Sequence, residues 1–313
     1  MQVATSLVPI FAVIALGIVL RRGNYLTREM TQGFNWFAYF WALPLFLFYK
    51  LGTAASGDPI ANTFIVALLA ATLLTLIASW IAASAMKLAP ASKGAFVQAS
   101  FRGNLAFIGL PLILFTIEGL TKQEMAQLET TVLLTLPPVV IFYNAAAVAI
   151  LALYNQSASE TFSWKIVLRN IALNPLLMAC VGGMLIQKSG FPMPTVIERT
   201  CMMVGAAAFP LALVGIGSQM ATLKVSQRWL EPMLTSIFKS VLCPVLGWLL
   251  GIAWGLEKSE LQMFLILCAV PTAVSGFVLA DQMRADADLA ASAVVLGTAF
   301  SFVPLSILLA IPF

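Results

Sequence analysis

One apolar run of this chain carries polar residues at its centre, and their types suggest binding chemistry. The run, 94–117, is about 24 residues long and could span a bilayer core of about 30 Å. Its centre holds a cation, two glycines, an amide and a proline: Arg102, Gly103, Asn104, Gly109 and Pro111. Proline and glycine break or weaken a helix, and Asn104 would lie about 15 Å deep. A broken polar helix at that depth is tolerated where it is buried in protein or lines a watery cavity, so the stretch predicts half of a substrate site.

A second run, 260–281, carries a similar interruption at similar depth. Pro271 lies about ten residues into it, which frees the carbonyl of Leu267, and three small or polar residues follow: Thr272, Ser275 and Gly276. The N-termini of the resulting half-helices would suit a carboxylate, and the freed carbonyls with the side-chain oxygens could hold a cation or a polar substrate. One kink alone would be explained by packing against neighbouring helices. The matched pair favours a site where the two breaks meet.

Two cations inside the predicted spans, Arg102 and Lys239, allow two interpretations. Charge within a span is rare and usually functional, so Arg102 could neutralise an anionic substrate. It could instead snorkel toward the inner face, about 12 Å away along its long stem. For Lys239 the same alternatives hold, and its flexible stem and the nearby inner end of the span favour snorkelling.

Three further polar residues are accessory candidates. Gln98 and Asn144 lie on neighbouring spans and could simply hydrogen-bond across helices. Asp281 closes its span at the inner face, where it would cap the helix or pair with Arg284. A role for Asp281 with a coupling ion is the weaker alternative.

The composition places the whole chain in a membrane. Its residues are 61 % hydrophobic and only 10 % charged, whereas soluble domains carry about 25 % charged residues. The net charge of +4 comes from basic residues spread over short links, so no nucleic-acid partner is expected. There is no histidine, no deep carboxylate pair and no metal spacing among the four cysteines, so we expect neither an enzyme nor a metal or other cofactor. A coupling ion, sodium or a proton, stays open.

Apolar runs predict ten membrane-spanning helices and no soluble domain. The spans are 3–20, 34–50, 60–86, 94–117, 127–154, 165–187, 196–221, 232–255, 260–281 and 287–312. With the N-terminus outside, ten lysines and arginines fall in or beside inner links and five beside outer ones. Arg21 and Arg22 follow the first apolar run, whereas a signal peptide has its positive residues first. We therefore predict a multi-pass protein of the inner or plasma membrane with both termini outside.

The two halves of the chain repeat. Three pairs of prolines stand 166 positions apart in corresponding spans: Pro9 and Pro175, Pro44 and Pro210, Pro138 and Pro304. Gly17 and Gly183 share that offset, and Gly109 and Gly276 are 167 apart. Five spans per half is an odd number, so the second repeat, 164–313, must enter the membrane inverted relative to the first, 1–155. Inverted repeats with paired broken helices, here the fourth and ninth, are typical of secondary transporters.

At these residues the chain resembles the auxin efflux carrier family, which includes bacterial organic-acid carriers and the plant PIN-FORMED auxin transporters. The pattern of Arg102, Gly103, Asn104, Gly109 and Pro111 resembles the break in the family's fourth helix. The runs 271–280 and 289–297, followed by Pro304, resemble its last two helices. The likeness covers the whole chain, which lacks the long cytoplasmic loop of the plant carriers and their ionisable residues on the third and fifth helices.

The resemblance implies an architecture and a mechanism. It implies a scaffold of helices 1, 2, 6 and 7, a transport unit of helices 3–5 and 8–10, an elevator-type movement and a homodimer. Substrate would bind where helices 4 and 9 cross, with Asn104 as its best single contact. The function expected is secondary transport of a small organic anion, such as a malonate- or malate-like carboxylate or an auxin-like acid. A non-transporting membrane receptor or channel-like protein on the same fold is the alternative.

Overall fold

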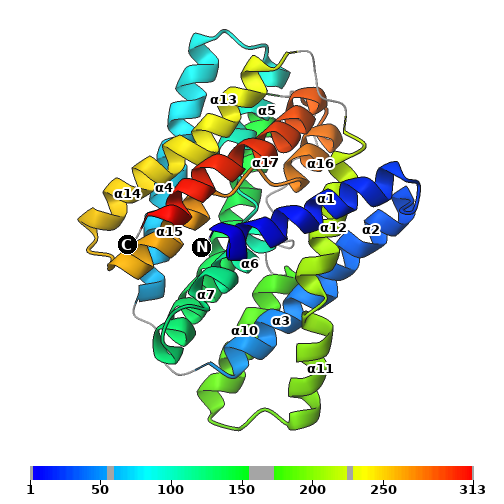
Figure 1. The fold of residues 1–313 in the computed structure, drawn as a ribbon. Helices are drawn as coiled ribbons and strands as arrows, with labels where there is room; N and C mark the ends of the chain where they lie inside the picture. The colour runs from blue at the N-terminus through cyan, green and yellow to red at the C-terminus, as the bar shows by residue number, and fades with distance from the viewer. Residues whose placement is uncertain (1–2, 55–59, 155–172, 224–227, 312–313) are drawn as a thin grey trace.

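A computed structural model describes residues 3–54, 60–154, 173–223 and 228–311, and these residues fold into helices without any strand (Figure 1). In chain order the first half holds η1 (Val3–Leu7), α1 (Val8–Arg22), α2 (Arg28–Phe37), η2 (Ala38–Ala42), α3 (Leu43–Gly52), α4 (Ile60–Ala85), α5 (Pro90–Phe101), η3 (Leu105–Gly109), α6 (Leu110–Ile117) and α7 (Lys122–Tyr154). The second half holds α10 (Pro175–Ser189), α11 (Thr195–Gly205), α12 (Ala208–Met220), α13 (Leu230–Ile237), η4 (Phe238–Leu242), α14 (Cys243–Ala253), α15 (Lys258–Ala269), α16 (Ser275–Gln282) and α17 (Ala287–Ala310). The η segments are π-helical turns.

Six helical segments in the described residues are long and apolar enough to cross a membrane: Val3–Arg22, Ile60–Ala85, Lys122–Tyr154, Thr195–Met220, Leu230–Ala253 and Ala287–Ala310. Each coincides with a span predicted from the sequence. The predicted spans 94–117 and 260–281 are each broken in two, as α5 with η3 and α6, and as α15 with α16. Part of the predicted span 165–187 lies outside the described residues. The all-helical, multi-pass fold is therefore confirmed, and the ten-span inverted repeat stays a prediction.

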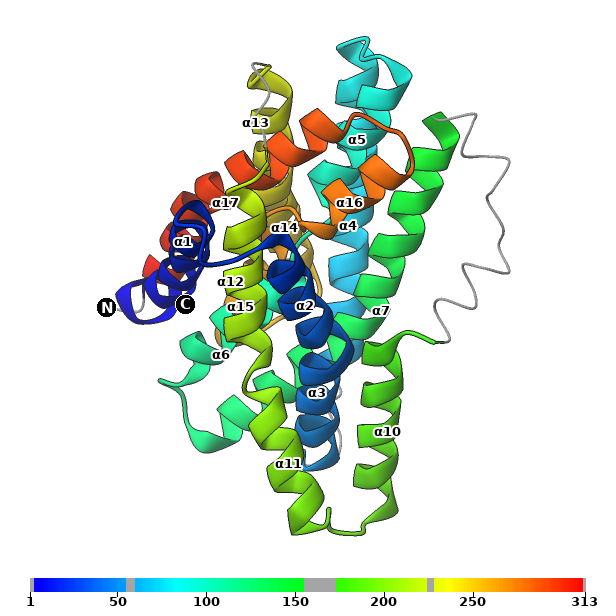
Figure 2. The same ribbon diagram turned by 90° about the vertical axis from the view of Figure 1, so that its right-hand side faces the viewer.

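The helices pack in two groups (Figures 1 and 2). In one group α1 and α2 pack against α12, and α3 packs against α10 and α11. In the other, α4 packs with α5, α7 and α14, while α13 and α15 pack against α17. The groups meet along the broken helices, where η3 contacts α12, and along α7, which contacts α3 and α10.

Two close glycine contacts join helices of the first half of the chain to helices of the second. A Cβ atom on Gly17 would overlap the carbonyl oxygen of Val214, and one on Gly183 would lie 2.8 Å from that of Phe48. Gly183 stands 166 positions after Gly17, and Val214 stands 166 positions after Phe48. In the first contact the glycine belongs to the first half of the chain, and in the other it belongs to the second half. In both, the small residue lets two helix backbones approach closely.

Each of the four π-helical turns η1 to η4 ends two residues before a proline: Pro9, Pro44, Pro111 and Pro244. In three of them the residue after the turn donates its amide five residues back, as Leu110 does to Leu105. A proline ring clashes with the carbonyl four residues back, and a widened turn relieves that clash. The helices therefore continue through these prolines.

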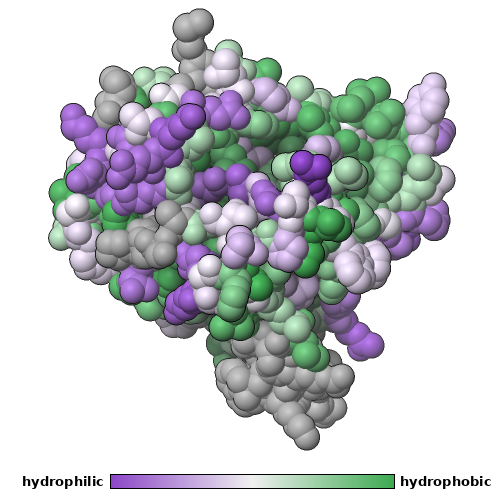
Figure 3. Space-filling view, turned by 90° about the horizontal axis from the view of Figure 1, so that it is seen from below, coloured by the Kyte–Doolittle hydropathy of each residue, from purple (hydrophilic) through white to green (hydrophobic). Residues whose placement is uncertain are grey.

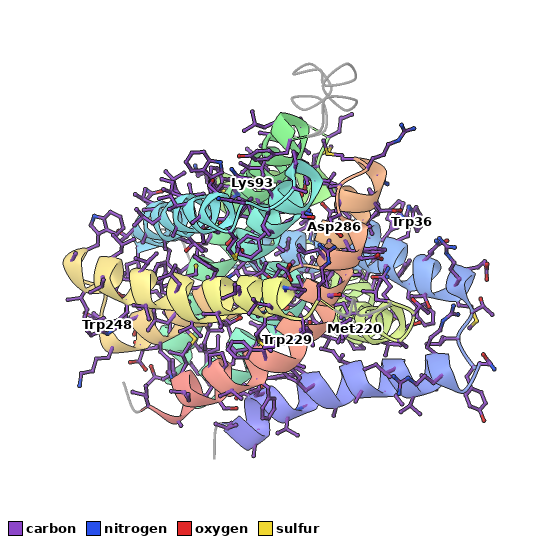
Figure 4. The ribbon with its side chains drawn as sticks, turned by 90° about the horizontal axis from the view of Figure 1, so that it is seen from above. Trp36, Lys93, Met220, Trp229, Trp248 and Asp286 are labelled. Atoms are coloured by element: carbon purple, nitrogen blue, oxygen red, sulfur yellow. The ribbon has the colours of Figure 1, made fainter. Side chains whose placement is uncertain are left out.

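The surface matches a bilayer environment. Large apolar side chains are exposed along the helices, and they include six tryptophans. Two of these, Trp36 and Trp248, lie on opposite sides of the molecule (Figure 4). Seen from below, hydrophilic residues gather in groups beside broad hydrophobic areas (Figure 3). Tryptophan at the ends of apolar spans is typical of the membrane–water interface.

Candidate functional site

The two broken helices cross and join through their backbones. α5 ends at Phe101 and α15 ends at Ala269, so the residues that follow cannot use helical hydrogen bonds. The amide of Asn104 donates to the carbonyl of Pro271 at 2.8 Å, and the amide of Ala273 donates to the carbonyl of Arg102 at 3.0 Å. Gly103 and Thr272 form an isolated antiparallel bridge between these bonds. Polar backbone groups buried in the bundle thus satisfy one another, as the low-dielectric interior requires.

Buried side chains reinforce this crossing. The Thr272 hydroxyl donates to the carbonyl of Ala99 at 2.7 Å, and Nε2 of Gln98 donates to the carbonyl of Gly276 at 2.8 Å. Thr272 and Gln98 are 2 % and 1 % exposed. Both therefore hold one broken helix to the other, and Gln98 bonds across helices as the simpler interpretation predicted.

Two of the predicted glycines, Gly103 and Gly109, allow the two broken helices to approach each other closely at the crossing. A Cβ atom on Gly103 would lie 2.9 Å from Cγ2 of Val270, and one on Gly109 would lie 3.2 Å from Cγ1 of the same residue. Pro111 lies eight residues beyond the crossing point, inside α6, behind a π-helical turn. Gly103 thus marks the break itself, whereas Gly109 and Pro111 shape the half-helix that follows.

A cavity of about 240 Å³ lies against the crossing. Five residues expected at or near the site line it: Arg102, Gly103, Asn104, Asn144 and Ser275. The other predicted site residues, Gly109, Pro111, Pro271, Thr272 and Gly276, are not part of its lining. Of these, Pro271, Thr272 and Gly276 form hydrogen bonds across the crossing. The opposite wall comes from α2, η2, α10 and α12, through Asn35, Tyr39, Leu176, Ile216 and Gln219. The cavity therefore lies between the two groups of helices.

Arg102 supplies the positive charge of this cavity. It is only 7 % exposed, and its Nη2 donates to Oδ1 of Asn144 at 2.5 Å. Within the described residues its buried Nη1 has no hydrogen-bond partner, and no carboxylate pairs with the guanidinium. The snorkelling interpretation is therefore wrong for Arg102, because the side chain stays in the protein. A buried guanidinium with free donors is suited to a carboxylate.

Asn104 lies at the start of the π-helical turn η3. Its Oδ1 accepts from the amide of Phe107 at 3.4 Å, so the carboxamide caps this turn while the residue also lines the cavity. Ser275 begins α16 on the other arm and is exposed to the cavity. The two half-helices thus begin at one space, and their positive ends add to the charge of Arg102.

A family model described as membrane transport protein matches residues 2–309. The chain belongs to this family of transporters. The match confirms the resemblance to auxin efflux carriers, and it makes the protein a multi-pass membrane transporter with a small-molecule substrate. The transporter is also 21 % identical over 308 residues to an uncharacterized transporter of Methanocaldococcus jannaschii, a similarity that covers 95 % of each chain.

Lys239 of the transporter is wholly buried, which contradicts the favoured prediction that it snorkels. Its ammonium donates to the carbonyl of Cys268 in the last turn of α15. A Cβ atom on Gly103 would lie 2.7 Å from Cε of Lys239, so the side chain lies directly against the crossing. The prediction rested on the flexible stem of lysine and the nearby inner end of the span. It failed because the break in the ninth span provides a buried acceptor, the Cys268 carbonyl.

Asp281 lies at a second cavity, of about 460 Å³, together with Arg21 and Arg28. The expected ion pair with Arg284 is not found among the described residues, and a backbone bond from the Arg284 amide to the Asp281 carbonyl turns the chain there. Gln219 and Val278 line both cavities, which therefore adjoin. The larger cavity gives the transporter a polar approach to the crossing from the end that carries the α1–α2 link.

Sequence reasoning missed the far wall of the cavity. Asn35, Tyr39 and Gln219 are polar residues within or beside apolar spans, a pattern that signals function in membrane helices. Gly215 is a further signal, since a Cβ atom there would overlap Oδ1 of Asn35. The glycine thus makes room for a cavity-lining amide of the neighbouring helix.

Proposed function

We propose that the protein is a secondary transporter of a small organic anion, and that Arg102 binds the anionic group. The observation that carries this proposal is a buried guanidinium whose Nη1 is unpartnered among the described residues, at a cavity between two broken helices. Asn144 is a neutral partner, so the positive charge is available to a ligand. A carboxylate there would be held by a charge-assisted hydrogen bond, with the Asn104 side chain beside it.

The single cation and the small cavity narrow the class of substrate. A volume of about 240 Å³ is below the usual range of about 300–1,000 Å³ for ligand sites, so a small acid fits best. Much of the remaining lining is apolar or aromatic, including Phe107, Leu176 and Ile216. One carboxylate at Arg102 with a compact apolar body therefore suits the cavity better than a malonate- or malate-like dianion, because Arg102 is the one cationic side chain among the described residues that line it.

Alternating access by an elevator movement is supported by the arrangement of the helices. The two packing groups correspond to the proposed scaffold, helices 1, 2, 6 and 7, and the proposed transport unit, helices 3–5 and 8–10. The cavity lies between them, and both broken helices belong to the second group. Moving that group along the first would carry the site across the membrane. The repeated glycine contact, Gly17 with Val214 and Gly183 with Phe48, supports the inverted repeat that such a mechanism uses.

An ion pair between the groups supports a state closed at one end. Lys50 of α3 and Glu129 of α7 lie 2.8 Å apart, beyond the cavity from the α1–α2 link. The corresponding approach at the other end is the cavity that Arg21 and Asp281 line. In the predicted topology this is the inner side, and that arrangement favours an inward-open state of the carrier.

Proteoliposome uptake tests the proposal. Radiolabelled monocarboxylates and dicarboxylates of similar size are offered, and unlabelled acid inside the vesicles should accelerate uptake by counterflow. A channel-like protein would show no counterflow, and a receptor would show binding without uptake. Asn104→Ala should weaken substrate binding while the protein stays folded, whereas Asn62→Ala, at an exposed asparagine of α4, is the matched control and should leave it unchanged. Binding and uptake that Asn104→Ala leaves intact would contradict the site.

A further inference from the structure

Lys239 is a buried cation for which the proposed substrate site has no use. It is 0 % exposed, lies outside the lining of the cavity, and has no carboxylate partner among the residues that the structure describes. Isolated buried charges are costly, so a buried ammonium without a carboxylate must be stabilised by dipoles. Its environment therefore indicates what the charge does.

That environment is the C-terminal side of the crossing. The ammonium donates to the carbonyl of Cys268, in the last turn of α15. A Cβ atom on Gly103, two residues past the end of α5, would lie 3.1 Å from Nζ of Lys239. Helix C-termini carry partial negative charge and carbonyls without helical partners, so a cation at this point is favourable. The thiols of Cys243 and Cys268 also lie near it.

The crossing thus has two chemically opposite sides. The half-helix N-termini, with Asn104 and Ser275, face the cavity and favour an anion. The half-helix C-termini, with the Cys268 carbonyl, face Lys239 and favour a cation. In transporters with discontinuous helices, C-terminal ends and unwound carbonyls are groups that coordinate sodium. Here a covalently attached ammonium lies against them.

We propose that Lys239 is a tethered counter-cation, which takes the place of a free monovalent cation behind the crossing and makes the transporter independent of sodium. It is a positioning residue, because it neutralises the ends of α5 and α15 and fixes Gly103 without touching substrate. Removing the charged side chain should open a space beside the Cys268 carbonyl and the ends of α5 and α15, into which sodium or a small alkylammonium ion can bind.

Thermal unfolding of the purified transporter tests this without any substrate, so the result is independent of the anion proposal. Melting temperatures are compared in sodium, potassium and choline chloride at equal ionic strength. Wild type should melt at one temperature in all three. Lys239→Ala should lose roughly 10 °C in choline and recover part of that loss in sodium or with added methylammonium, since a ligand that binds the folded state raises its stability. Lys239→Met should lose stability in every salt, because its side chain fills the space without charge.

Two controls keep the outcome decisive. Ser240→Ala changes the neighbouring buried residue of η4 and should show no cation dependence. Lys239→Arg keeps the charge and should stay insensitive to sodium even if it is less stable, which provides a readout if Lys239→Ala does not fold. The proposal is overturned if wild type is itself stabilised by sodium, if Lys239→Arg becomes sodium-dependent, or if a folded Lys239→Ala variant gains nothing from sodium or methylammonium.

Discussion

The amide of Asn104 donates to the carbonyl of Pro271, and these two residues stand 167 positions apart, the offset that also separates Gly109 from Gly276. The crossing therefore joins residues that would be equivalent in the predicted internal repeat. Its charges do not follow that symmetry. Arg102 corresponds to Ala269 at this offset, and Lys239 corresponds to Thr72. Each half contributes one cation, and the two cations serve opposite sides of the crossing.

Arg102→Gln should weaken binding of a carboxylate substrate by about 10- to 100-fold, because it removes a buried charge-assisted hydrogen bond. Arg102→Lys should recover part of the affinity but not all of it, since an ammonium cannot reproduce the guanidinium fork. Substrate-induced thermal shifts measure both. The control is Lys93→Gln, at a cation that lies over the rings of Trp80 and Tyr154 and away from the cavity. Equal affinity in wild type and Arg102→Gln would rule out this residue as the anion contact.

Thr272→Val should lower both stability and transport, because it removes the hydrogen bond that Thr272 makes to Ala99 across the crossing. An unsatisfied buried carbonyl costs about 1–3 kcal/mol. Thr116→Val is the matched control, since that buried hydroxyl donates at the same 2.7 Å to Leu112 within its own helix. Denaturation and uptake are measured for both variants. A transport defect as large in Thr116→Val as in Thr272→Val would show that the crossing has no special role.

Gly17→Ala and Gly183→Ala should each destabilise the fold by about 1–3 kcal/mol, since either methyl group would overlap a backbone oxygen of the neighbouring helix. Gly33→Ala is the control, because nothing lies within 4 Å of the position its methyl would take. It should be neutral or stabilising by up to about 1 kcal/mol. Unfolding in detergent compares the three. Destabilisation by only one of the first two variants would count against equivalent contacts in the two halves.

The environment of Asp286, which is labelled in Figure 4, predicts a specific pH dependence of stability. Partial burial alone would raise its pKa, but hydrogen bonds from Ser92, the Leu289 amide and Arg228 outweigh this and lower the pKa below its ordinary value. A depressed carboxyl pKa stabilises the fold fully above the ordinary value near 3.8, and the contribution is lost as the pH falls through the folded-state pKa.

Asp286→Asn should therefore be less stable than wild type at neutral pH, and the gap should narrow as the pH falls below the ordinary value. Melting temperatures of both proteins across that range provide the measurement. Asp288→Asn, an exposed carboxyl two residues further on, is the control. A gap that stays constant with pH would mean that the carboxylate charge contributes nothing.

Much of the crossing could be predicted from the sequence, since polar and helix-breaking residues deep in an apolar run are costly against lipid and persist chiefly where protein or a cavity surrounds them. The position of the break within 94–117 could not be predicted from the sequence. The helix ends at Phe101, whereas the chain stays helical through Pro111 because the π-helical turn η3 precedes it. The burial of Lys239 also depended on a tertiary partner, the Cys268 carbonyl. The cavity wall formed by Tyr39 and Gln219 required knowing which helices face each other.

The π-helical turns have a consequence for comparing this chain with its relatives. Each such turn amounts to one extra residue in an α-helix, and one residue corresponds to about 100° of rotation about the helix axis. The wider turn of η3 takes up one such residue, so α6 keeps its orientation toward its neighbours. A homologue without this turn should align with a single-residue gap between Asn104 and Pro111, and an alignment without that gap would pair residues of α6 that point in different directions.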